Sequence, residues 1–374
     1  MADKTHGSPE FKYWVRLSKL NLRSESADAT PIKLTPLPQQ IKISKGSVSF
    51  DANAVLEFNL LTDSQFILDY LLSEIKQHLG KSVSYTQKKS ENRKNAEIYQ
   101  SEIKQLPQNQ RQNFLNEGYL FEINKSAQTC EILAETSNGI FYGIQTLFQL
   151  FNNMSTEKEC VAPACEILDF PDMKLRSLSD DISRGQAATP DGIKKFIVEL
   201  SRFKLNHYFL YIEDVVQIKK HPAIGVQRGA LTKESIQEIS AFAKNYFITL
   251  SPIFESLGHM DNILSLKEYR HLAEFPGSDC LNISDPKSYD LLDDIYAELA
   301  ETFDSTDFHV ACDESWEAGD YRSREHMQKL GVGNAYLEHY KKIYDLAKKH
   351  GKTRIFIYRS EEHTSELQSP NTTS

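Results

Sequence analysis

Apolar and polar residues alternate in several short segments between residues 36 and 165, a pattern typical of strands with one buried face. Two longer segments, 64–79 and 138–151, instead carry apolar residues at helical spacing. Strands are expected at 40–43, 48–50, 55–58, 96–99, 118–123 and 129–134. We therefore predict a small α+β domain over residues 36–165.

The segments on either side of this domain lack such a pattern. Residues 1–35 are polar with few apolar side chains, so we expect a poorly ordered lead-in. Residues 160–171 are predicted to form a connector, because Pro171 disfavours helix at the preceding Phe170.

From residue 174 onward, short apolar strands alternate with amphipathic helices. The expected strands are 174–181, 207–212, 247–252, 307–311 and 354–358, and the helices between them are 189–203, 232–246, 287–303 and 334–350. This alternation is typical of βαβ units around a parallel sheet. It predicts an α/β domain over residues 166–358, a (β/α) barrel of the TIM type.

The last residues, 359–374, are polar and without periodicity. They resemble the translation of a common sequencing-adapter oligonucleotide, so we expect an artefactual, disordered tail, with a natural polar tail as the alternative. Only about five βα units then precede it, where the barrel closes with eight. We therefore expect a C-terminally truncated barrel and an incomplete, inactive copy of the protein.

Polar side chains recur at one place in this pattern, just after each strand of the second domain. They are Asp180, Asp181 and Arg184 after the first strand, Glu213 and Asp214 after the second, Glu255, Gly258 and His259 after the third, and Asp313 and Glu314 after the fourth. The catalytic loops of a (β/α) barrel meet at that end of the strands. The sequence therefore predicts an active site there, although Asp313 and Glu314 alone would also fit a plain loop before a helix.

The composition of the chain limits the classes of molecule that it is expected to bind. The 374 residues have a net charge of −9, 40% hydrophobic residues and no Lys/Arg-rich block, which argues against a nucleic-acid partner. No stretch is apolar enough to span a membrane, and the polar start is no signal peptide, so a cytoplasmic location is the default expectation. No cofactor or metal is expected, because the histidines at 207, 221, 259 and 271 are not at ligand spacing.

The five cysteines are odd in number and irregularly spaced, which favours free thiols in a reducing compartment. Cys312, beside the acidic pair, allows two interpretations. It is a candidate nucleophile by position, but the end of a core strand favours buried packing.

Four segments together resemble glycoside hydrolase family 20, the β-N-acetylhexosaminidases. These are Asp181-Ile182-Ser183-Arg184-Gly185, Leu257-Gly258-His259, the strand Phe308-His309-Val310-Ala311-Cys312-Asp313-Glu314, and the helix segment from Gly139 to Leu150. The best-known members carry Gly-Gly where this chain has Ala311-Cys312. The loop from Pro252 to Met260 is closer to the hexosaminidase D-like branch.

The resemblance implies hydrolysis of terminal GlcNAc or GalNAc from β-linked glycans, with the substrate's own acetamide oxygen as nucleophile. Glu314 would be the general acid and then base, with a pKa raised by burial and by the charge of Asp313. Asp313 would hold the acetamide. Arg184 would bind sugar hydroxyls, and His259 would position the acidic pair.

Each binding role has an alternative. Arg184 could instead clamp the first loop to Asp181 or Asp214, and His259 could be a loop histidine without a role. Asp214 and Glu255 are candidate substrate contacts or, alternatively, supports behind them. Trp316 is either a platform for a sugar ring or packing beneath its loop.

Two other functions remain open. One is a non-catalytic glycan-binding protein on a degenerate barrel, against which the intact acidic pair argues. The other is a retaining glycosidase with a separate nucleophile, for example Glu255 acting with Glu314. The expected partner is a carbohydrate substrate in each case, and the sequence leaves the oligomeric state and the sugar preference open.

Overall fold

A computed structural model describes residues 12–23, 32–51, 53–60, 64–88, 103–154 and 160–358 of the protein. The chain forms two compact units. The first comprises Met1–Arg176 with Ser201–Lys204, and the second comprises Ser177–Leu200 with Leu205–Ser374. The chain thus leaves the first unit later than the boundary predicted at residues 165 and 166. The predicted strand at 96–99 and the predicted tail at 359–374 lie outside the described residues.

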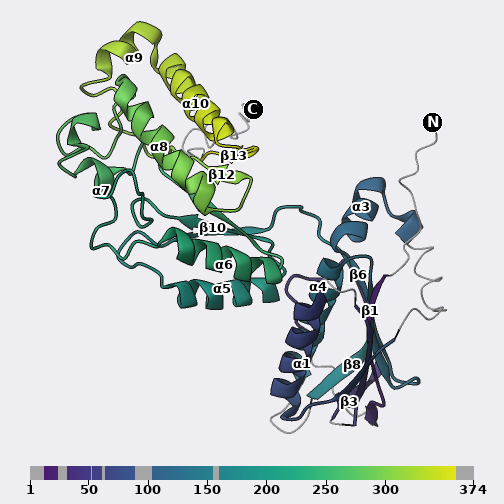
Figure 1. Ribbon diagram of the computed structural model, residues 1–374. Helices are drawn as coiled ribbons and strands as arrows, with labels where there is room; N and C mark the ends of the chain where they lie inside the picture. Colours follow the sequence, from purple (N-terminus) through teal and green to yellow (C-terminus); the bar gives the residue numbers. More distant parts are fainter. Residues whose placement is uncertain are drawn as a thin grey trace, which may run out of the picture. The chain divides into compact units, whose positions relative to one another are not determined.

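The first unit is built on an eight-stranded sheet with helices packed against it (Figure 1). The strand order is β2-β3-β8-β6-β7-β1-β4-β5, and all neighbours are antiparallel except β4 and β5. The strands are β1 (Tyr13–Ser18), β2 (Asn21–Arg23), β3 (Gln40–Phe50), β4 (Val55–Asn59), β5 (Ser84–Gln87), β6 (Tyr119–Asn124), β7 (Thr129–Ala134) and β8 (Cys160–Asp169). The helices are α1 (Gln65–Leu79), α3 (Gln108–Glu117) and α4 (Ser137–Met154).

Helix α4 lies close to the sheet because it carries a glycine where it meets β7. A Cβ atom at Gly143 would lie 2.4 Å from Ile132 Cγ2, so any larger residue would push the helix outward. Ile140, Ile144 and Leu147 of the same helix are fully buried, as their helical spacing predicts.

Two predictions for this unit were wrong. The expected lead-in contains β1 and β2, and β1 lies inside the sheet between β7 and β4 with Trp14 and Leu17 buried. The expected connector is β8, which pairs with β3 and β6. In both cases the segment is stabilised by strands distant in sequence, which a local pattern cannot reveal. The predicted strands at 40–43 and 48–50 are one strand, β3, with an irregularity between Ile43 and Ser47.

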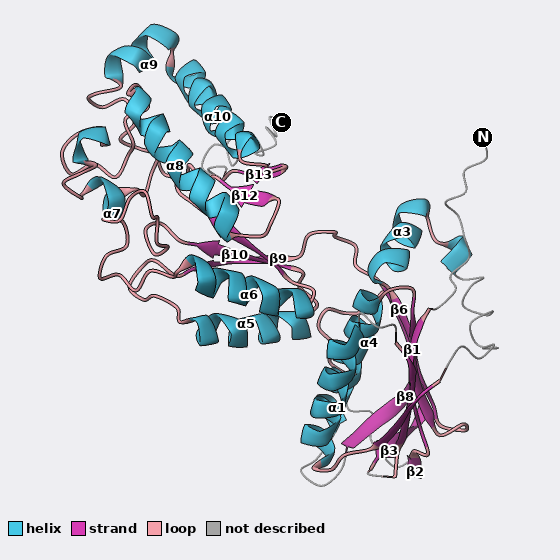
Figure 2. Cartoon of the chain, in the orientation of Figure 1, coloured by secondary structure: helices cyan, strands magenta, loops and turns pink. Residues whose placement is uncertain are grey.

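The second unit has the predicted parallel sheet, in the order β13-β12-β11-β10-β9 (Figure 2). Its strands are β9 (Ser177–Asp181), β10 (His207–Tyr211), β11 (Thr249–Ile253), β12 (Asp307–His309) and β13 (Arg354–Phe356). The long helices between them are α5 (Pro190–Arg202), α6 (Lys233–Asn245), α8 (Pro286–Thr302) and α10 (Val332–Lys349). Three short helices were not predicted: α7 (Asp261–Leu264), η2 (Arg270–Leu272) and α9 (Arg324–Leu330).

Two of these helices begin at residues whose side chains cap the first turn. Thr232 Oγ1 accepts the Ser235 N–H at 3.1 Å and begins α6. Asp285 Oδ1 accepts the Lys287 N–H at 2.9 Å and begins α8, with proline at its first position. Every residue of β10 is buried, as expected for a strand covered on both faces. Among the described residues, no helix is both long and apolar enough to cross a membrane.

Candidate active site

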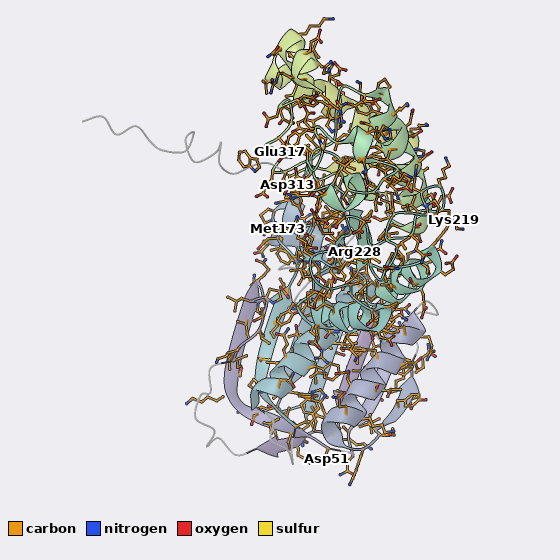
Figure 3. The ribbon with its side chains drawn as sticks, turned by 90° about the vertical axis from the view of Figure 1, so that its left-hand side faces the viewer. Asp51, Met173, Lys219, Arg228, Asp313 and Glu317 are labelled. Atoms are coloured by element: carbon orange, nitrogen blue, oxygen red, sulfur yellow. The ribbon has the colours of Figure 1, made fainter. Side chains whose placement is uncertain are left out.

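Side chains from four neighbouring strands meet at one edge of the parallel sheet. Because parallel strands end on the same side, the residues that follow β9, β10, β11 and β12 come together. Ion pairs and hydrogen bonds link Arg184 with Glu213, and His259 with Glu314. Asp313 and Arg228, both in the second unit, are labelled in Figure 3. The predicted gathering of polar residues at the strand ends is confirmed.

The backbone turns sharply between β12 and the acidic pair. Ala311, Cys312 and Glu314 have φ angles of 53°, 72° and 46°, in the left-handed region that side chains rarely adopt. His309 Nδ1 accepts the Ala311 N–H at 3.0 Å and fixes the start of the turn. The carboxylates of two sequence neighbours can diverge only across such a turn, because strand residues otherwise simply alternate.

Glu314 contacts the predicted histidine. His259 Nε2 lies 3.1 Å from Glu314 Oε2 and 4.0 Å from Asp313 Oδ2, so His259 lies beside both carboxylates of the acidic pair. A Cβ atom at Gly258 would lie 2.5 Å from the Asp313 carbonyl oxygen, which explains the glycine before the histidine. The expected burial of Glu314 is wrong for the described residues, because its side chain is 61% exposed.

Arg184 is clamped on one side and open on the other. Its guanidinium donates to the Tyr211 hydroxyl at 2.8 Å and lies 3.3 Å from both Asp181 and Glu213. The side chain is still 53% exposed, so donors remain available to a ligand. The predicted clamp to Asp181 is present, but the partner from β10 is Glu213 rather than Asp214.

Asp214 is buried and pairs with Arg228, whose Nε lies 3.1 Å from Asp214 Oδ2. Arg228 also donates to the Ser183 carbonyl at 2.8 Å, so the pair joins the loops after β9 and β10. A direct contact between Asp214 and substrate is therefore not supported, and its supporting role is the interpretation that fits.

Glu213 was predicted among the residues at the strand ends, but the sequence assigned it no role. Its carboxylate accepts from Asn262 Nδ2 at 2.6 Å and from the Tyr211 hydroxyl at 3.2 Å, besides pairing with Arg184. Its position beside Asp214 at the end of β10 was visible in the sequence. The spacing alone could not decide which of the two carboxylates faces the site.

Glu255 is also buried, with 1% of its surface exposed, and Glu255 Oε2 accepts the Cys312 N–H at 3.3 Å. It lies beside Asp313 rather than in contact with open solvent. Cys312 is buried as well, its thiol donates to the Val310 carbonyl at 3.2 Å, and burial raises the pKa of this thiol well above its usual range. The prediction that Cys312 packs in the core is confirmed.

Trp316 is 65% exposed, so packing beneath its loop is excluded. Its backbone N–H donates to the Glu314 carbonyl at 2.9 Å, which ties the indole-bearing loop to the acidic pair. The loop is anchored further on by Glu274, which the sequence did not single out. Glu274 Oε1 accepts the N–H groups of Tyr321 and Ser323 at 2.8 Å and 3.0 Å.

One group of potential metal ligands occurs among the described residues: Asp279, Cys280 and Glu317, with ligand atoms within 4.8 Å of one another. Burial raises the pKa of the Cys280 thiol to about 12, so this sulfur stays protonated at neutral pH. Proximity alone does not make this group a metal site.

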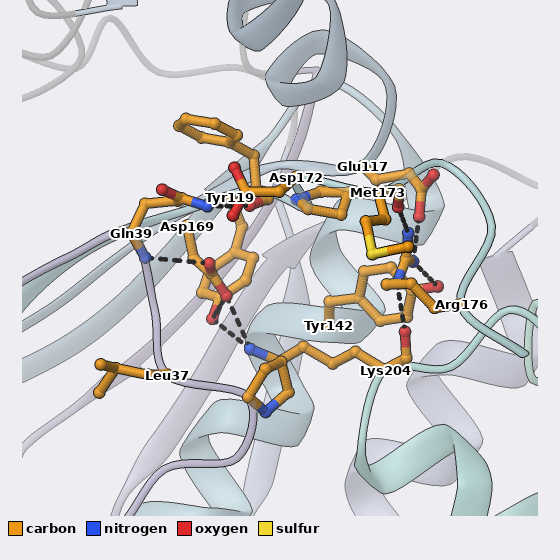
Figure 4. A pocket seen from close by; sticks show the side chains of 13 residues that line it. Leu37, Gln39, Glu117, Tyr119, Tyr142, Asp169, Asp172, Met173, Arg176 and Lys204 are labelled. Atoms are coloured by element: carbon orange, nitrogen blue, oxygen red, sulfur yellow. Dashed lines mark hydrogen bonds and ion pairs between the residues drawn. The ribbon is translucent and has the colours of Figure 1, made fainter. Parts of the chain in front are cut away.

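The first unit has a separate pocket of about 210 Å³ (Figure 4). Lys204 Nζ donates there to Asp169 Oδ2 at 2.8 Å and to the Tyr119 hydroxyl at 2.7 Å. Arg176 donates to the Tyr142 hydroxyl at 3.0 Å. The charged groups satisfy one another, so we interpret this pocket as a structural network.

Comparison with known proteins matches most of the chain to one family. Residues 31–170 match glycosyl hydrolase family 20, domain 2, and residues 174–369 match the glycosyl hydrolase family 20 catalytic domain. The chain is 28% identical to a beta-hexosaminidase of Porphyromonas gingivalis over 64% of its own length and 35% of that protein. It is 25% identical to beta-hexosaminidase subunit A2 of Dictyostelium discoideum over 79% of its own length and 55% of that protein. The chain thus spans about a third to a half of these relatives.

Solved structures show the same fold. One is the GH20 exo β-N-acetylglucosaminidase of Vibrio harveyi with N-acetylglucosamine, with a TM-score of 0.68 at 21% identity, covering 94% of this chain and 60% of that one. Another is the Streptomyces plicatus N-acetyl-β-hexosaminidase, with a TM-score of 0.66 at 20% identity, covering 90% and 68%. The predicted fold, a small α+β domain followed by a barrel domain of the TIM type, is confirmed. The chain belongs to glycosyl hydrolase family 20.

Proposed function

We propose that the protein to which these residues belong removes terminal N-acetylhexosamine from β-linked glycans. The observation that carries the proposal is the adjacent carboxylates Asp313 and Glu314 on the turn after β12, with His259 3.1 Å from Glu314 and the half-exposed Arg184 on the loop after β9. Relatives that cover much of this chain are beta-hexosaminidases.

The reaction proceeds in two steps without an enzyme nucleophile. In the first, Glu314 gives its proton to the glycosidic oxygen while the acetamide oxygen of the substrate attacks the anomeric carbon. The bond to the leaving alcohol breaks, and a cyclic oxazolinium-like intermediate forms. Asp313 accepts a hydrogen bond from the acetamide N–H and stabilises the positive charge.

In the second step Glu314 acts as a base. It takes a proton from water, whose oxygen attacks the anomeric carbon and opens the ring, so the acetamide is restored and the configuration is retained. His259 and Arg184 contribute by position: His259 holds the Glu314 carboxyl, and Arg184 offers donors to sugar hydroxyls.

The alternative with Glu255 as a separate nucleophile is not favoured. Glu255 is almost fully buried and lies behind Asp313, so it has no free path to an anomeric carbon. A purely binding protein is disfavoured too, because nothing in glycan binding requires two adjacent carboxylates on a strained turn.

Release of nitrophenol from aryl β-N-acetylglucosaminides and β-N-acetylgalactosaminides tests the proposal. Glu314→Gln should lower kcat by about 10²- to 10⁴-fold, because it removes the proton donor. The loss should shrink with dinitrophenyl substrates, whose leaving groups need no proton. Asp313→Asn should lower kcat for every leaving group alike.

Glu317→Gln is the matched control, since it changes an acidic side chain on the same loop outside the proposed machinery. Equal turnover by an active parent and its Glu314→Gln variant on all substrates would refute the assignment of Glu314. Failure of a thiazoline mimic of the cyclic intermediate to bind an active parent would refute the substrate-assisted mechanism.

A further inference from the structure

Two buried carboxyl oxygens without a hydrogen-bond partner belong to two neighbouring side chains, Glu255 and Asp313. Glu255 Oε1 and Asp313 Oδ1 receive no hydrogen bond from any donor in the described part of the chain. The two carboxyl groups nevertheless lie within hydrogen-bonding reach of each other. An ionised carboxylate only accepts hydrogen bonds, so this contact is favourable only if one of the two groups holds a proton.

The surroundings of Glu255 decide which of the two carboxyl groups holds the proton. Several titratable groups surround Glu255. Those near it are Tyr211 from β10, Tyr296 from α8, Tyr358 after β13, and Cys312 and Asp313 after β12. Glu213 and His259 line a small cavity together with Glu255, and this cavity is too small for a water molecule. His259 is occupied with Glu314 at 3.1 Å. Asp313, by contrast, keeps part of its side chain exposed.

Burial, together with the charge of Asp313, raises the pKa of Glu255 to about 10. Ionisation of both groups would place two like charges side by side in a buried place, which costs far more than leaving one proton in place. Both the burial of Glu255 and the repulsion between the two charges therefore indicate that Glu255, rather than Asp313, holds the proton.

We propose that Glu255 is protonated at neutral pH and donates this proton to Asp313 Oδ1, so that the pair shares one proton and one negative charge. Glu255 is then a positioning residue, and the role rests on the proposed function. It orients the Asp313 carboxylate and leaves Oδ2 for the acetamide N–H of the substrate. Its other oxygen accepts the Cys312 N–H, so one side chain fixes both the strained turn and the carboxylate beyond it.

Infrared spectroscopy tests the proton directly and needs no turnover. The difference spectrum of the parent minus Glu255→Gln at pH 7 should contain the C=O stretch of a protonated carboxyl group. The matched control is Glu131→Gln, which changes a buried glutamate paired with Arg16 at 3.0 Å and should show only a carboxylate band. Absence of the protonated band in the Glu255→Gln difference would overturn the proposal.

Binding of the thiazoline mimic tests the positioning role. Glutamine can donate to Asp313 and accept from Cys312 as a protonated glutamate does, so Glu255→Gln should bind within about threefold of the parent. Glu255→Leu lacks the donor and should bind about 10- to 100-fold more weakly. If thiazoline binding weakened equally in both variants, the positioning role would be overturned. Binding would then depend on a negative charge at Glu255 rather than on a proton donated to Asp313.

The infrared test and the binding test distinguish the shared proton from the proposed function. A protonated band in a chain that does not bind the thiazoline would support the shared proton while giving the proposed function no support, so the two proposals can fail separately. If Glu255→Leu fails to fold, the comparison of the parent with Glu255→Gln still decides, since a tenfold loss in the glutamine variant would contradict the inference.

Discussion

Ala311 and Cys312 carry side chains in a backbone conformation that glycine adopts far more easily. The left-handed conformation costs a residue with a Cβ roughly 1–2 kcal/mol. The turn is kept because its surroundings hold it: Ala311 packs with Phe209 and Ile253, and its carbonyl accepts the Tyr358 N–H at 3.1 Å.

Replacing Ala311 with glycine should therefore change stability little. Relief of strain offsets the lost methyl contact and the extra freedom of the unfolded chain, so we expect a change of less than about 0.5 kcal/mol. Ala311→Val should cost about 2 kcal/mol or more, because a β-branched side chain fits this conformation worse. Urea unfolding followed by circular dichroism measures both.

The control for this prediction is Ala347→Gly, at a buried alanine inside α10. It should cost about 1 kcal/mol, since glycine weakens a helix interior. A loss as large in Ala311→Gly as in the control would contradict the strain at the turn.

The buried proton at Glu255 makes stability depend on pH. The pKa is raised from 4.5 in the unfolded chain to about 10 in the folded one, so the folded state binds one more proton throughout this window. Its contribution to the free energy of unfolding is therefore largest below pH 4.5 and falls as the pH rises towards 10. Glu255→Gln lacks this contribution.

Urea unfolding at pH 5, 7 and 9 tests this dependence. The stability of the parent relative to Glu255→Gln should fall steadily over the three values. A constant difference between the two proteins would show that Glu255 titrates alike in the folded and unfolded states.

Among single residues, the sequence predicted positions better than contacts. Asp313, Glu314, Arg184 and His259 all follow strand ends as predicted, because strand ends and loop motifs are local features, whereas their roles stay predictions. The choice between Asp214 and Glu213 needed the direction of each side chain after β10. That direction depends on the φ angle of 31° at Glu213, which the sequence does not reveal.

At the scale of elements, the loop after β12 depends on a buried carboxylate from elsewhere. Glu274 is fully buried and accepts the N–H groups of Tyr321 and Ser323. It therefore satisfies backbone donors at the start of α9 that would otherwise lack partners. Trp316 and Glu317 lie on the segment between this anchor and the acidic pair.

Glu274→Ala should loosen this segment. The loss of hydrogen bonds to a buried charge predicts a cost of about 1.5–3 kcal/mol. Hydrogen exchange measured by mass spectrometry should show faster exchange over residues 316–330, with little change in β9 and β10. The control Glu301→Ala removes only an exposed pair with Lys233 and should cost less than about 1 kcal/mol. Uniformly faster exchange in all elements would point to global destabilisation instead.

The strands and long helices of the second unit were predictable because each carries its own local signal. Thr232 and Asp285 begin helices, and the strands between the helices are short and apolar. The first unit was harder. β1 and β8 gain their stability from partners far away in the sequence, and β5 is exposed along its whole length. Hydrophobic pattern gave no sign of these pairings.

At the scale of the whole molecule, the first unit buries an ion pair beneath its pocket. Lys204 and Asp169 are both nearly inaccessible, and the Tyr119 hydroxyl lies between them. Burial lowers the pKa of Lys204 and raises that of Tyr119 well above its usual range. Removing one partner would leave an uncompensated charge in the interior.

Lys204→Met should therefore cost about 3–5 kcal/mol of stability, and the double variant with Asp169→Asn should recover part of that loss. Thermal unfolding followed by circular dichroism measures the effect. Lys244→Met, which removes an exposed pair with Asp304, should cost less than about 1 kcal/mol. A double variant no more stable than Lys204→Met would show that the hydrogen bonds, rather than the charges, stabilise the network.

All five cysteines are free and buried. Cys130, Cys160 and Cys165 belong to the first unit, while Cys280 and Cys312 belong to the second. A thiol-reactive dye can modify a buried thiol only after local or global opening exposes it. The protein thus carries native reporters in both units, and the order in which its cysteines are alkylated would tell which unit opens first.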